Sequence, residues 1–227
     1  MRSRFCLPAF NWLGLKTTLG INFTMHGNRS ELTGLILAGG QSSRMHGNDK
    51  GLVPLNGSPL IKHVIKRLQP QVDTIIISCN RNLSSYQQFG YPLIRDNIKD
   101  QSIVFNGPLA GILSGLACIN SEFALIVPCD NPDLPTQLAL RLFHELIHSR
   151  TDIAVPHDGQ RIQPLYLLLK TRLLPQLSHF YAQGGRSVIK WLGTQKIAEV
   201  DFATQDDCFN NINTPDDIVA FEQKQAP

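Results

Sequence analysis

Short apolar runs alternate with segments of helical period along most of this chain. Where such runs are bounded by glycine, proline or polar residues they predict strands, here at 33–40 (TGLILAGG), 73–80 (DTIIISCN), 91–96 (YPLIRD) and 123–130 (FALIVPCD). Helices are predicted between them, at 58–70, 82–89 and 107–119. Strands that alternate with helices of this length form βαβ units around a mostly parallel sheet. The pattern therefore predicts an α/β fold.

The second half of the chain extends this pattern. FALIVPCD is the most apolar run, and we expect it at the centre of the sheet because buried parallel strands read as continuous apolar stretches. A helix from Pro135 to about 149 precedes two strands, 152–159 and 161–170, separated by a turn at Asp158-Gly159. The remaining predictions are helices at 171–182 and 186–193, a strand at 196–202 and a helix from Thr214, capped by TPDD. Residues 31–227 are thus expected to form a single three-layer α/β domain with a small mixed C-terminal part.

Composition excludes several classes of protein. With 227 residues, 42% of them hydrophobic, the chain has enough apolar surface for a core without disulfide bonds. Its 21 Lys+Arg and 18 Asp+Glu give a net charge of +3, too small and too scattered for binding nucleic acid. No apolar run approaches the ~18–20 residues of a membrane span. The five cysteines are widely spaced and form no CxxC pair, which favours a reduced, cytoplasmic protein without structural zinc.

Residues 1–30 precede the regular pattern and are treated as an extension. Two arginines and a short apolar stretch faintly suggest a signal peptide, but Pro8, Asn11 and Lys16 break that stretch. No small-residue cleavage site follows. Met25 would begin the domain cleanly, and residues 1–28 are expected to be poorly ordered.

The segment LAGGQSSRMHGNDKG (37–51) is the strongest candidate for binding phosphate. A strand ends in Gly39 and Gly40, and a polar loop then brings Arg44 and Lys50 to the same edge. Glycine lets backbone N–H groups approach a phosphate, arginine binds it bidentately, and lysine adds a mobile charge. The spacing is neither that of a P-loop nor that of a dinucleotide-binding fold. A plain glycine turn with solvated basic residues is the alternative.

Polar side chains also follow the other predicted strands. Asp130 ends the most apolar strand and suits Mg²⁺, which uses one or two protein carboxylates together with substrate phosphates. Capping the next helix is the alternative role, for which Asp133 is better placed. Asp96 can accept hydrogen bonds from a ribose or a base edge, or simply cap its loop. The helix opened by NGPLAG (106–111) can receive an anion or a ring edge at its N-terminus, or simply pack closely through its small residues.

Other reactive side chains give weaker signals. Cys129 lacks a histidine partner and is predicted to be a small buried residue, and His63 to be structural or solvated. HELIH (144–148) matches the HExxH motif of zinc hydrolases. No third ligand is apparent nearby, and a core-facing helix is indicated by Leu142, Leu146 and Ile147. The zinc hydrolase interpretation is therefore a minor alternative.

Together these segments resemble the nucleotidyltransferase superfamily with a Rossmann-like fold, and most closely the molybdenum cofactor guanylyltransferase family. LAGGQSSRMHGNDKG looks like the superfamily's signature loop. The supporting segments, in order, are SCNR (78–81), LIRD ending at Asp96, GPLAG (107–111), PCD (128–130) and NINTPDD (211–217). They extend over nearly all of the chain after the extension, so the resemblance is specific.

This resemblance implies a reaction and a set of roles. The family joins GMP from GTP to the phosphate of molybdenum-loaded molybdopterin and releases pyrophosphate with Mg²⁺. By position, the nucleotide would be lined by Leu37, Ala38 and Gly39, with Lys50 on its phosphates, Asp96 on the nucleotide and Asp130 on both nucleotide and Mg²⁺. Asn211 and Asn213 match a motif for the molybdopterin side. Proteins that deliver molybdopterin or mature molybdoenzymes are the expected partners.

Two positions depart from the family pattern. His46 stands where members often have glycine, and a positive φ would be costly for histidine. Ser78 stands where members often have asparagine, and the nucleotide contact is therefore placed on Asn80.

The chemistry of the residues agrees with this reaction. A phosphate monoester is mostly dianionic at neutral pH and needs no catalytic base, which fits the lack of a His/Asp or Cys/His pair. Lys50, Arg44 and Asp130 are the expected catalytic residues, acting by charge neutralisation. The alternatives are a cytidylyltransferase for the same pterin, where LAAG tends to replace LAGG, a sugar-1-phosphate nucleotidyltransferase, usually a longer chain, and a non-catalytic nucleotide-binding module.

Overall fold

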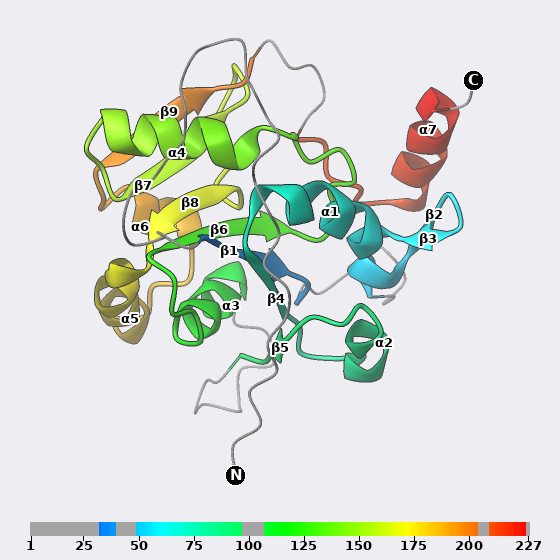
Figure 1. Cartoon of the computed structure of the whole chain (residues 1–227), viewed down its shortest axis with the longest axis horizontal. Coiled ribbons are helices and arrows are strands. Elements are labelled where there is room, and N and C mark those ends of the chain that lie inside the picture. Colours follow the sequence, from blue (N-terminus) through cyan, green and yellow to red (C-terminus); the bar gives the residue numbers. More distant parts are fainter. Residues whose placement is uncertain (1–31, 40–48, 97–106, 204–208, 226–227) are drawn as a thin grey trace.

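A seven-stranded, mostly parallel sheet forms the centre of the computed structural model, which describes residues 32–39, 49–96, 107–203 and 209–225 (Figure 1). The strand order is β5-β4-β1-β6-β8-β7-β9. The strands are β1 (Leu32–Leu37), β4 (Thr74–Ser78), β5 (Leu93–Ile94), β6 (Phe123–Pro128), β7 (Ile153–His157), β8 (Leu167–Lys170) and β9 (Ile197–Asp201). β8 pairs antiparallel with both β6 and β7, whereas the other pairs are parallel. The predicted fold class is confirmed, and β6 lies at the centre as expected.

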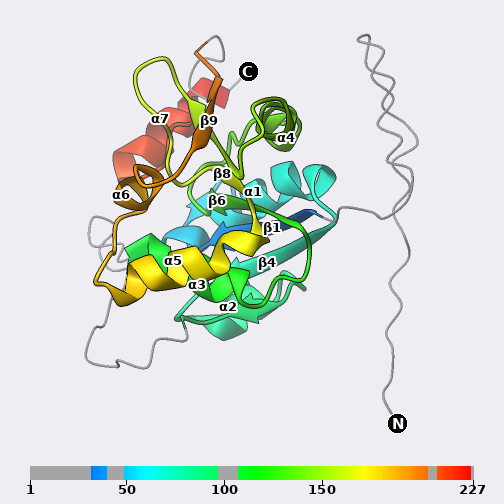
Figure 2. The same cartoon turned by 90° about the vertical axis from the view of Figure 1, so that its left-hand side faces the viewer.

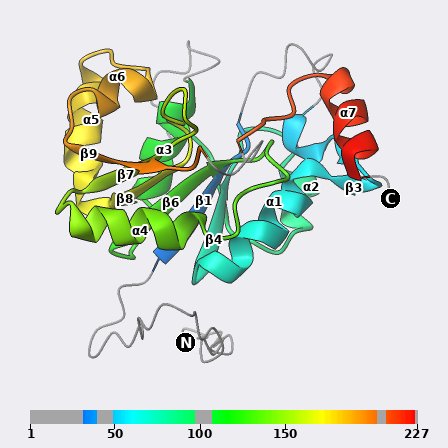
Figure 3. The ribbon, with the colours of Figure 1, turned by 90° about the horizontal axis from the view of Figure 1, so that it is seen from above.

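Helices cover both faces of this sheet and give it three layers. They are α1 (Leu60–Leu68), α2 (Leu83–Gln87), α3 (Gly107–Leu116), α4 (Leu138–His148), α5 (Leu174–Ala182), α6 (Val188–Leu192) and α7 (Pro215–Gln225). Figure 3 shows α1 and α4 on one side of the strands and α3, α5 and α6 on the other. Figure 2 shows α3 and α5 beside each other on the second face. Among the described residues, no helix is both long and apolar enough to span a membrane.

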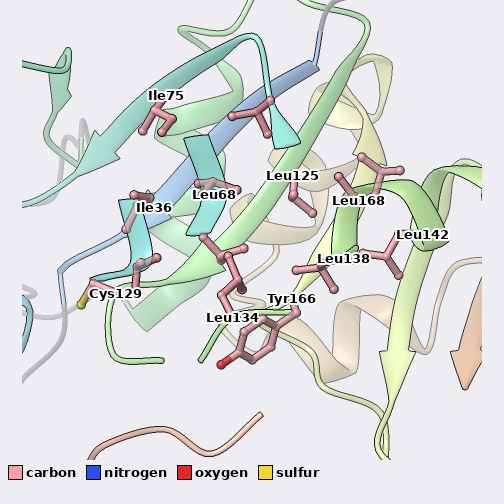
Figure 4. Close-up of a cluster of buried hydrophobic side chains, with 14 of the residues drawn as sticks. Ile36, Leu68, Ile75, Leu125, Cys129, Leu134, Leu138, Leu142, Tyr166 and Leu168 are labelled. Carbon is pink, nitrogen blue, oxygen red and sulfur yellow. The ribbon is translucent and has the colours of Figure 1, made fainter. Parts of the chain in front are cut away.

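Successive side chains of the strands belong to two separate hydrophobic cores, one on each face of the sheet. On β1, Ile36 belongs to the cluster beneath α1 and α4, and its neighbour Leu35 to the cluster beneath α3, α5 and α6. The same alternation continues on β6, because successive residues of a strand point to opposite faces. In Figure 4, the first cluster extends from Ile75 to Leu142, and the ring of Tyr166 lies beside Leu134 with its hydroxyl pointing away from the apolar side chains.

The C-terminal helix α7 packs outside this sandwich. A two-stranded hairpin consists of β2 (Pro54–Leu55) and β3 (Ser58–Pro59). It contributes to a small apolar cluster with Ile212, which precedes α7, and with the partly buried Ile218 and Phe221 of α7. The predicted cap is confirmed: Asp217 accepts from the backbone N–H groups of Asn213 and Thr214 at 2.7 and 2.8 Å, and Thr214 Oγ1 accepts from Asp217 N at 3.2 Å. The cap therefore fixes the segment that leads into α7.

Two local predictions were wrong. α4 begins at Leu138 rather than Pro135, and Asp133 does not cap it, because the Asp133 carboxylate instead accepts from Arg67 at 3.1 Å. The strand predicted over 161–170 forms only at Leu167–Lys170. The expected mixed C-terminal part is formed by β8, β7 and β9, because β8 is antiparallel to its neighbours, and it is continuous with the central sheet. The expectations for residues 1–30, Gly40, Arg44 and His46 lie outside the described residues.

Candidate functional site

The carboxyl ends of β1, β4 and β6 lie side by side and define the candidate site. Ala38 N donates to Ser78 O at 2.8 Å, and Cys129 N donates to Leu37 O at 3.1 Å, so the three ends are tied by backbone hydrogen bonds. β4 and then β5 are added on one side of β1 and β6 is added on the other, which makes the β1/β6 boundary a switch point in the strand order. Ligands of open α/β sheets bind at such points, outside the carboxyl ends of the strands.

Lys50 connects this edge to two distant parts of the chain. It begins the short 3₁₀ turn Lys50–Leu52, and its Nζ donates to Asp130 Oδ2 and, at 2.6 Å, to Asn213 Oδ1. Asp130 is buried directly after β6, and Asn213 lies just before the cap of α7. The predicted carboxylate of Asp130 and Asn213 of the C-terminal motif therefore both contact the ammonium group of Lys50.

The two carboxylate oxygens of Asp130 have different surroundings. Oδ2 accepts from Lys50, whereas Oδ1 is buried and has no hydrogen-bond partner among the described residues. A buried carboxylate oxygen without a partner is costly unless a ligand satisfies it. An oxygen of this kind, beside the edge predicted to bind phosphate, fits a hard divalent cation such as Mg²⁺.

Asn80 and Asp96 form a second polar pair, at the ends of β4 and β5. Asn80 Nδ2 donates to Asp96 Oδ2, and Asp96 N donates to Asn80 Oδ1, both at 2.9 Å. Asp96 Oδ1 is buried and finds no partner within the part of the chain that the structure describes, and burial raises the pKa of this carboxyl above its ordinary value. The pair lies close to the glycine turn, because a Cβ on Gly39 would be 3.3 Å from Asn80 Nδ2. Gly39 and Asn80 are both exposed. Together with Oδ1 of Asp96, they thus lie at the same part of the sheet edge.

The start of α3 packs against the same strand ends. A Cβ on Gly111 would lie 2.9 Å from Ser78 Oγ and 3.7 Å from Asp96 Oδ1, so only glycine allows this approach. Ser78 is only 2% exposed beneath the helix. Between the two positions considered for a nucleotide contact, Asn80 is exposed and Ser78 is not.

Tyr166 was not predicted from the sequence, yet it joins two parts of the site. Its hydroxyl donates to Asn211 Oδ1 at 2.5 Å and accepts from Asn131 Nδ2 at 2.9 Å. Asn211 O in turn accepts from Asn213 Nδ2 at 3.0 Å. Tyr166 stands in a predicted strand of apolar character, and no local pattern marks its hydroxyl as a partner of the C-terminal motif.

The described residues do not support a zinc hydrolase site at the HELIH motif (144–148). His144 and His148 are exposed on α4 with parallel rings 6.3 Å apart, and Glu145 accepts from Ser149. No group of three or more His, Cys, Asp or Glu side chains that could hold a metal occurs in the described ranges. Ile147, expected in the core, is 52% exposed.

The two other side chains with weak signals behave as predicted. Cys129 is buried, and burial raises the pKa of its thiol well above the ordinary value. His63 Nε2 makes a structural hydrogen bond with Leu55 O at 3.0 Å. Neither arrangement provides a nucleophile.

The fold and this edge, with a lysine bound to a carboxylate, define a nucleotidyltransferase-type α/β enzyme. In agreement, the family model described as "MobA-like NTP transferase domain" matches residues 34–198. Two curated relatives named "Molybdenum cofactor guanylyltransferase" are each 44% identical to this chain. The protein from Vibrio cholerae aligns over 85% of this chain and 92% of its own length, and that from Shewanella frigidimarina over 86% and 94%. The chain belongs to the molybdenum cofactor guanylyltransferase family of MobA-like transferases.

A solved structure supports the fold. The crystal structure titled as molybdopterin-guanine dinucleotide biosynthesis protein A from Archaeoglobus fulgidus has a TM-score of 0.69 and 22% sequence identity. The alignment covers 85% of this chain and 97% of that one. At this identity the likeness establishes the three-layer fold alone.

Proposed function

We propose that this chain transfers GMP from GTP to the phosphate of molybdenum-molybdopterin, releasing pyrophosphate and forming the guanine dinucleotide form of the cofactor. The observation that carries the proposal is the position of Lys50 Nζ between Asp130 and Asn213. It brings together the parts of the chain assigned to the nucleotide and to the pterin. Relatives that share 44% of their residues with this chain carry the guanylyltransferase name.

The nucleotide is assigned to the ends of β1, β4 and β5. Leu37, Ala38 and Gly39 line it, and Asn80 and Asp96 contact it. Support comes from the exposure of Gly39 and Asn80 and from the unpartnered Oδ1 of Asp96, which can accept from an N–H or O–H of the nucleotide.

The chemical step requires alignment and charge neutralisation rather than a base. A phosphate oxygen of molybdopterin forms a bond to the α-phosphorus of GTP, and the bond from that phosphorus to the bridging oxygen breaks. The electron pair leaves with pyrophosphate. The nucleophile is already mostly dianionic at neutral pH. Lys50 and Arg44 bind and orient the phosphates, and they stabilise the charge that moves to the leaving group.

Asp130 is the proposed ligand of Mg²⁺. Its spare oxygen provides the protein's share of the coordination, and substrate phosphates provide more. Bound Mg²⁺ would neutralise phosphate charge at the reacting α-phosphorus and on pyrophosphate. Lys50 holds the other oxygen and so fixes the orientation of the carboxylate.

Asn211 and Asn213 are assigned to the molybdopterin side. Tyr166 and Lys50 hold their side chains at the same edge as Asp130. Proteins that deliver molybdopterin and receive the product would have to approach this edge.

The three cysteines in the described residues, Cys79, Cys118 and Cys129, are free thiols, which agrees with a reaction in the cytoplasm.

The test is pyrophosphate release from each of the four ribonucleoside triphosphates, with Mg²⁺ and molybdenum-loaded molybdopterin. We expect release with GTP only, and only when the pterin is present. Selectivity for CTP would identify a cytidylyltransferase of the same fold, and dependence on a sugar 1-phosphate would identify a sugar nucleotidyltransferase. GTP binding without any release would identify a binding module. Each of these three results would contradict the proposal.

A further inference from the structure

A buried carboxylate lies directly beside the proposed phosphate-binding lysine. Asp49 precedes Lys50, and its side chain is only 3% exposed. Tyr86 Oη donates to Asp49 Oδ1 at 2.5 Å, and Asn82 Nδ2 donates to Asp49 Oδ2 at 3.1 Å. Arg81 Nε lies 3.8 Å from the same Oδ2. Burying a carboxylate is costly, and these three partners are what make this one tolerable.

All three partners come from one short segment, residues 81–86, which contains the end of the connection from β4 and most of α2. This segment follows Asn80, which holds Asp96 at the proposed nucleotide edge. Asn82 adopts a left-handed backbone conformation with φ +52°, which asparagine tolerates better than most residues other than glycine. Its backbone O accepts from Ser85 N and Tyr86 N. This turn aims the Asn82 amide at Asp49 and begins the helix that carries Tyr86.

Tyr86 also packs directly against the turn that contains Lys50. A Cβ on Gly51 would lie 2.6 Å from Tyr86 Oη and 3.3 Å from Cys129 Sγ, so a side chain at 51 would separate the turn from both. Cys129 is the neighbour of Asp130. The ring of Tyr86 is fully buried, and burial, with the neighbouring Cys129 and Asp49, raises the pKa of its hydroxyl. The hydroxyl therefore keeps its proton at neutral pH and can donate a hydrogen bond to Asp49.

We propose that the hydrogen bond from Tyr86 to Asp49 is a positioning device that fixes the turn Lys50–Leu52 and thereby places Lys50 Nζ on Asp130 and on the substrate phosphates. The turn is held on one side of Lys50 by the Asp49 carboxylate and on the other by the close approach of Gly51. Tyr86 and Asp49 act through Lys50 and are not catalytic residues. The inference rests on the proposed function for the role of Lys50, but the position of the turn can be measured without it.

The first experiment compares Tyr86→Phe with Tyr91→Phe, which makes the same substitution at a partly buried tyrosine away from Lys50. Loss of one buried hydrogen bond to a carboxylate should lower the single-turnover rate of Tyr86→Phe by roughly tenfold to a hundredfold. Tyr91→Phe should keep the wild-type rate. In a Lys50→Ala background, Tyr86→Phe should cause almost no further loss, because the two changes remove the same contribution.

The second experiment needs no substrate. The protease Lys-C cuts after lysine, so cleavage of the native protein at Lys50-Gly51 reports how firmly the turn is held. We expect this cleavage to be about tenfold faster in Tyr86→Phe than in the wild type or Tyr91→Phe, with cleavage at Lys190 in α6 unchanged. Mass spectrometry identifies each cut.

The outcomes separate the two proposals. A wild-type rate in Tyr86→Phe, losses that multiply in the Lys50→Ala background, or unchanged cleavage at Lys50-Gly51 would each overturn the positioning role. A wild-type chain that is inactive with GTP and molybdenum-loaded molybdopterin would overturn the proposed function, while the cleavage rates still decide the positioning role. Should Tyr86→Phe fail to fold, Asp49→Asn undergoes the same tests, because the amide keeps an acceptor for Tyr86 but loses the charge. Its loss of rate should be smaller than that of Asp49→Leu.

Discussion

Asp130 uses its two carboxylate oxygens differently, and this division predicts the effect of removing them. Asp130→Ala deletes both the partner of Lys50 and the unpartnered Oδ1 assigned to Mg²⁺. We expect GTP-dependent pyrophosphate release to fall at least about a hundredfold, because electrostatic groups at the reacting centre contribute on this scale. The fold should persist, since Lys50 keeps its hydrogen bond to Asn213. Pyrophosphate assays and thermal melts measure both effects.

Asp133→Ala is the matched control for that change. It lies three residues further along the same loop and makes a partly exposed ion pair with Arg67 at 3.1 Å, so near-normal activity is expected. Normal Mg²⁺-dependent turnover in Asp130→Ala would show that the metal assignment is wrong.

Asp96 is expected to lower the stability of the native state at neutral pH and, at the same time, to strengthen the binding of GTP. Burial raises its pKa above the ordinary value of 3.8, so the native state holds the proton more tightly than the unfolded state does. Stability therefore increases as the pH falls through the raised native pKa, and at pH 7 the ionised carboxylate destabilises the native state. Asp96→Asn should raise the melting temperature at pH 7 by roughly 2–4 °C. It should also weaken GTP binding by about tenfold, the equivalent of one lost hydrogen bond.

The pH dependence checks the cause of that change. At an acidic pH below the raised native pKa of Asp96, where the wild-type carboxyl is protonated, the difference in melting temperature between the two proteins should largely vanish. Melts at both pH values and calorimetric titration with GTP make the comparison. A lower melting temperature for Asp96→Asn at pH 7 would refute the explanation by burial.

At the scale of elements, α3 depends on close contact with β1. A Cβ on Gly115 would lie 2.3 Å from Leu35 Cδ2, and Leu35 is fully buried in β1. Gly115→Ala must therefore shift α3 or force Leu35 out of its rotamer. We expect a loss of about 1–3 kcal/mol in the free energy of unfolding, typical of overpacked cores, as measured by urea denaturation.

Gly193→Ala provides the control. At this position a Cβ would make only ordinary contacts, the nearest at 3.5 Å, and φ is −62°. Its stability should equal or slightly exceed that of the wild type, because alanine restricts the unfolded chain. Equal denaturation midpoints for the two variants would contradict the proposed tight packing of α3.

At the scale of the whole molecule, ligand binding should stabilise the fold, because the proposed site gathers residues from the full length of the domain. A ligand that binds only the native state contributes about 2.7 kcal/mol at a hundred times its dissociation constant. GTP with Mg²⁺ at that concentration should raise the melting temperature by roughly 5–10 °C. CTP at the same concentration should raise it less. Equal shifts for the two nucleotides would contradict guanine selectivity.

The sequence predicts the strands of this protein well because buried parallel strands consist of continuous apolar runs. FALIVPCD was therefore located correctly at the centre of the sheet. Lys50, Asp96 and Asp130 could be proposed because each stands next to a strand end or in a recognisable loop. The hydrogen bonds of Tyr86 and Tyr166 could not be predicted, since each joins residues more than 30 positions apart without a local pattern. The start of α4 was misplaced because Pro135 is a favourable first residue of a helix but does not require one there.

The contact between Lys50 and Asn213 also sets an order of events during synthesis. The two residues are 163 positions apart, and translation at about 5–20 residues per second takes roughly 8–30 s to pass from one to the other. During that interval β1, β4 and β6 can already pair on a nascent chain, with Lys50 held by Asp130 alone. A ribosome that stalls before Asn211 would leave a chain with its nucleotide edge assembled and its pterin edge missing. If the proposed assignment of the two edges holds, the nascent chain would bind GTP before it could transfer GMP.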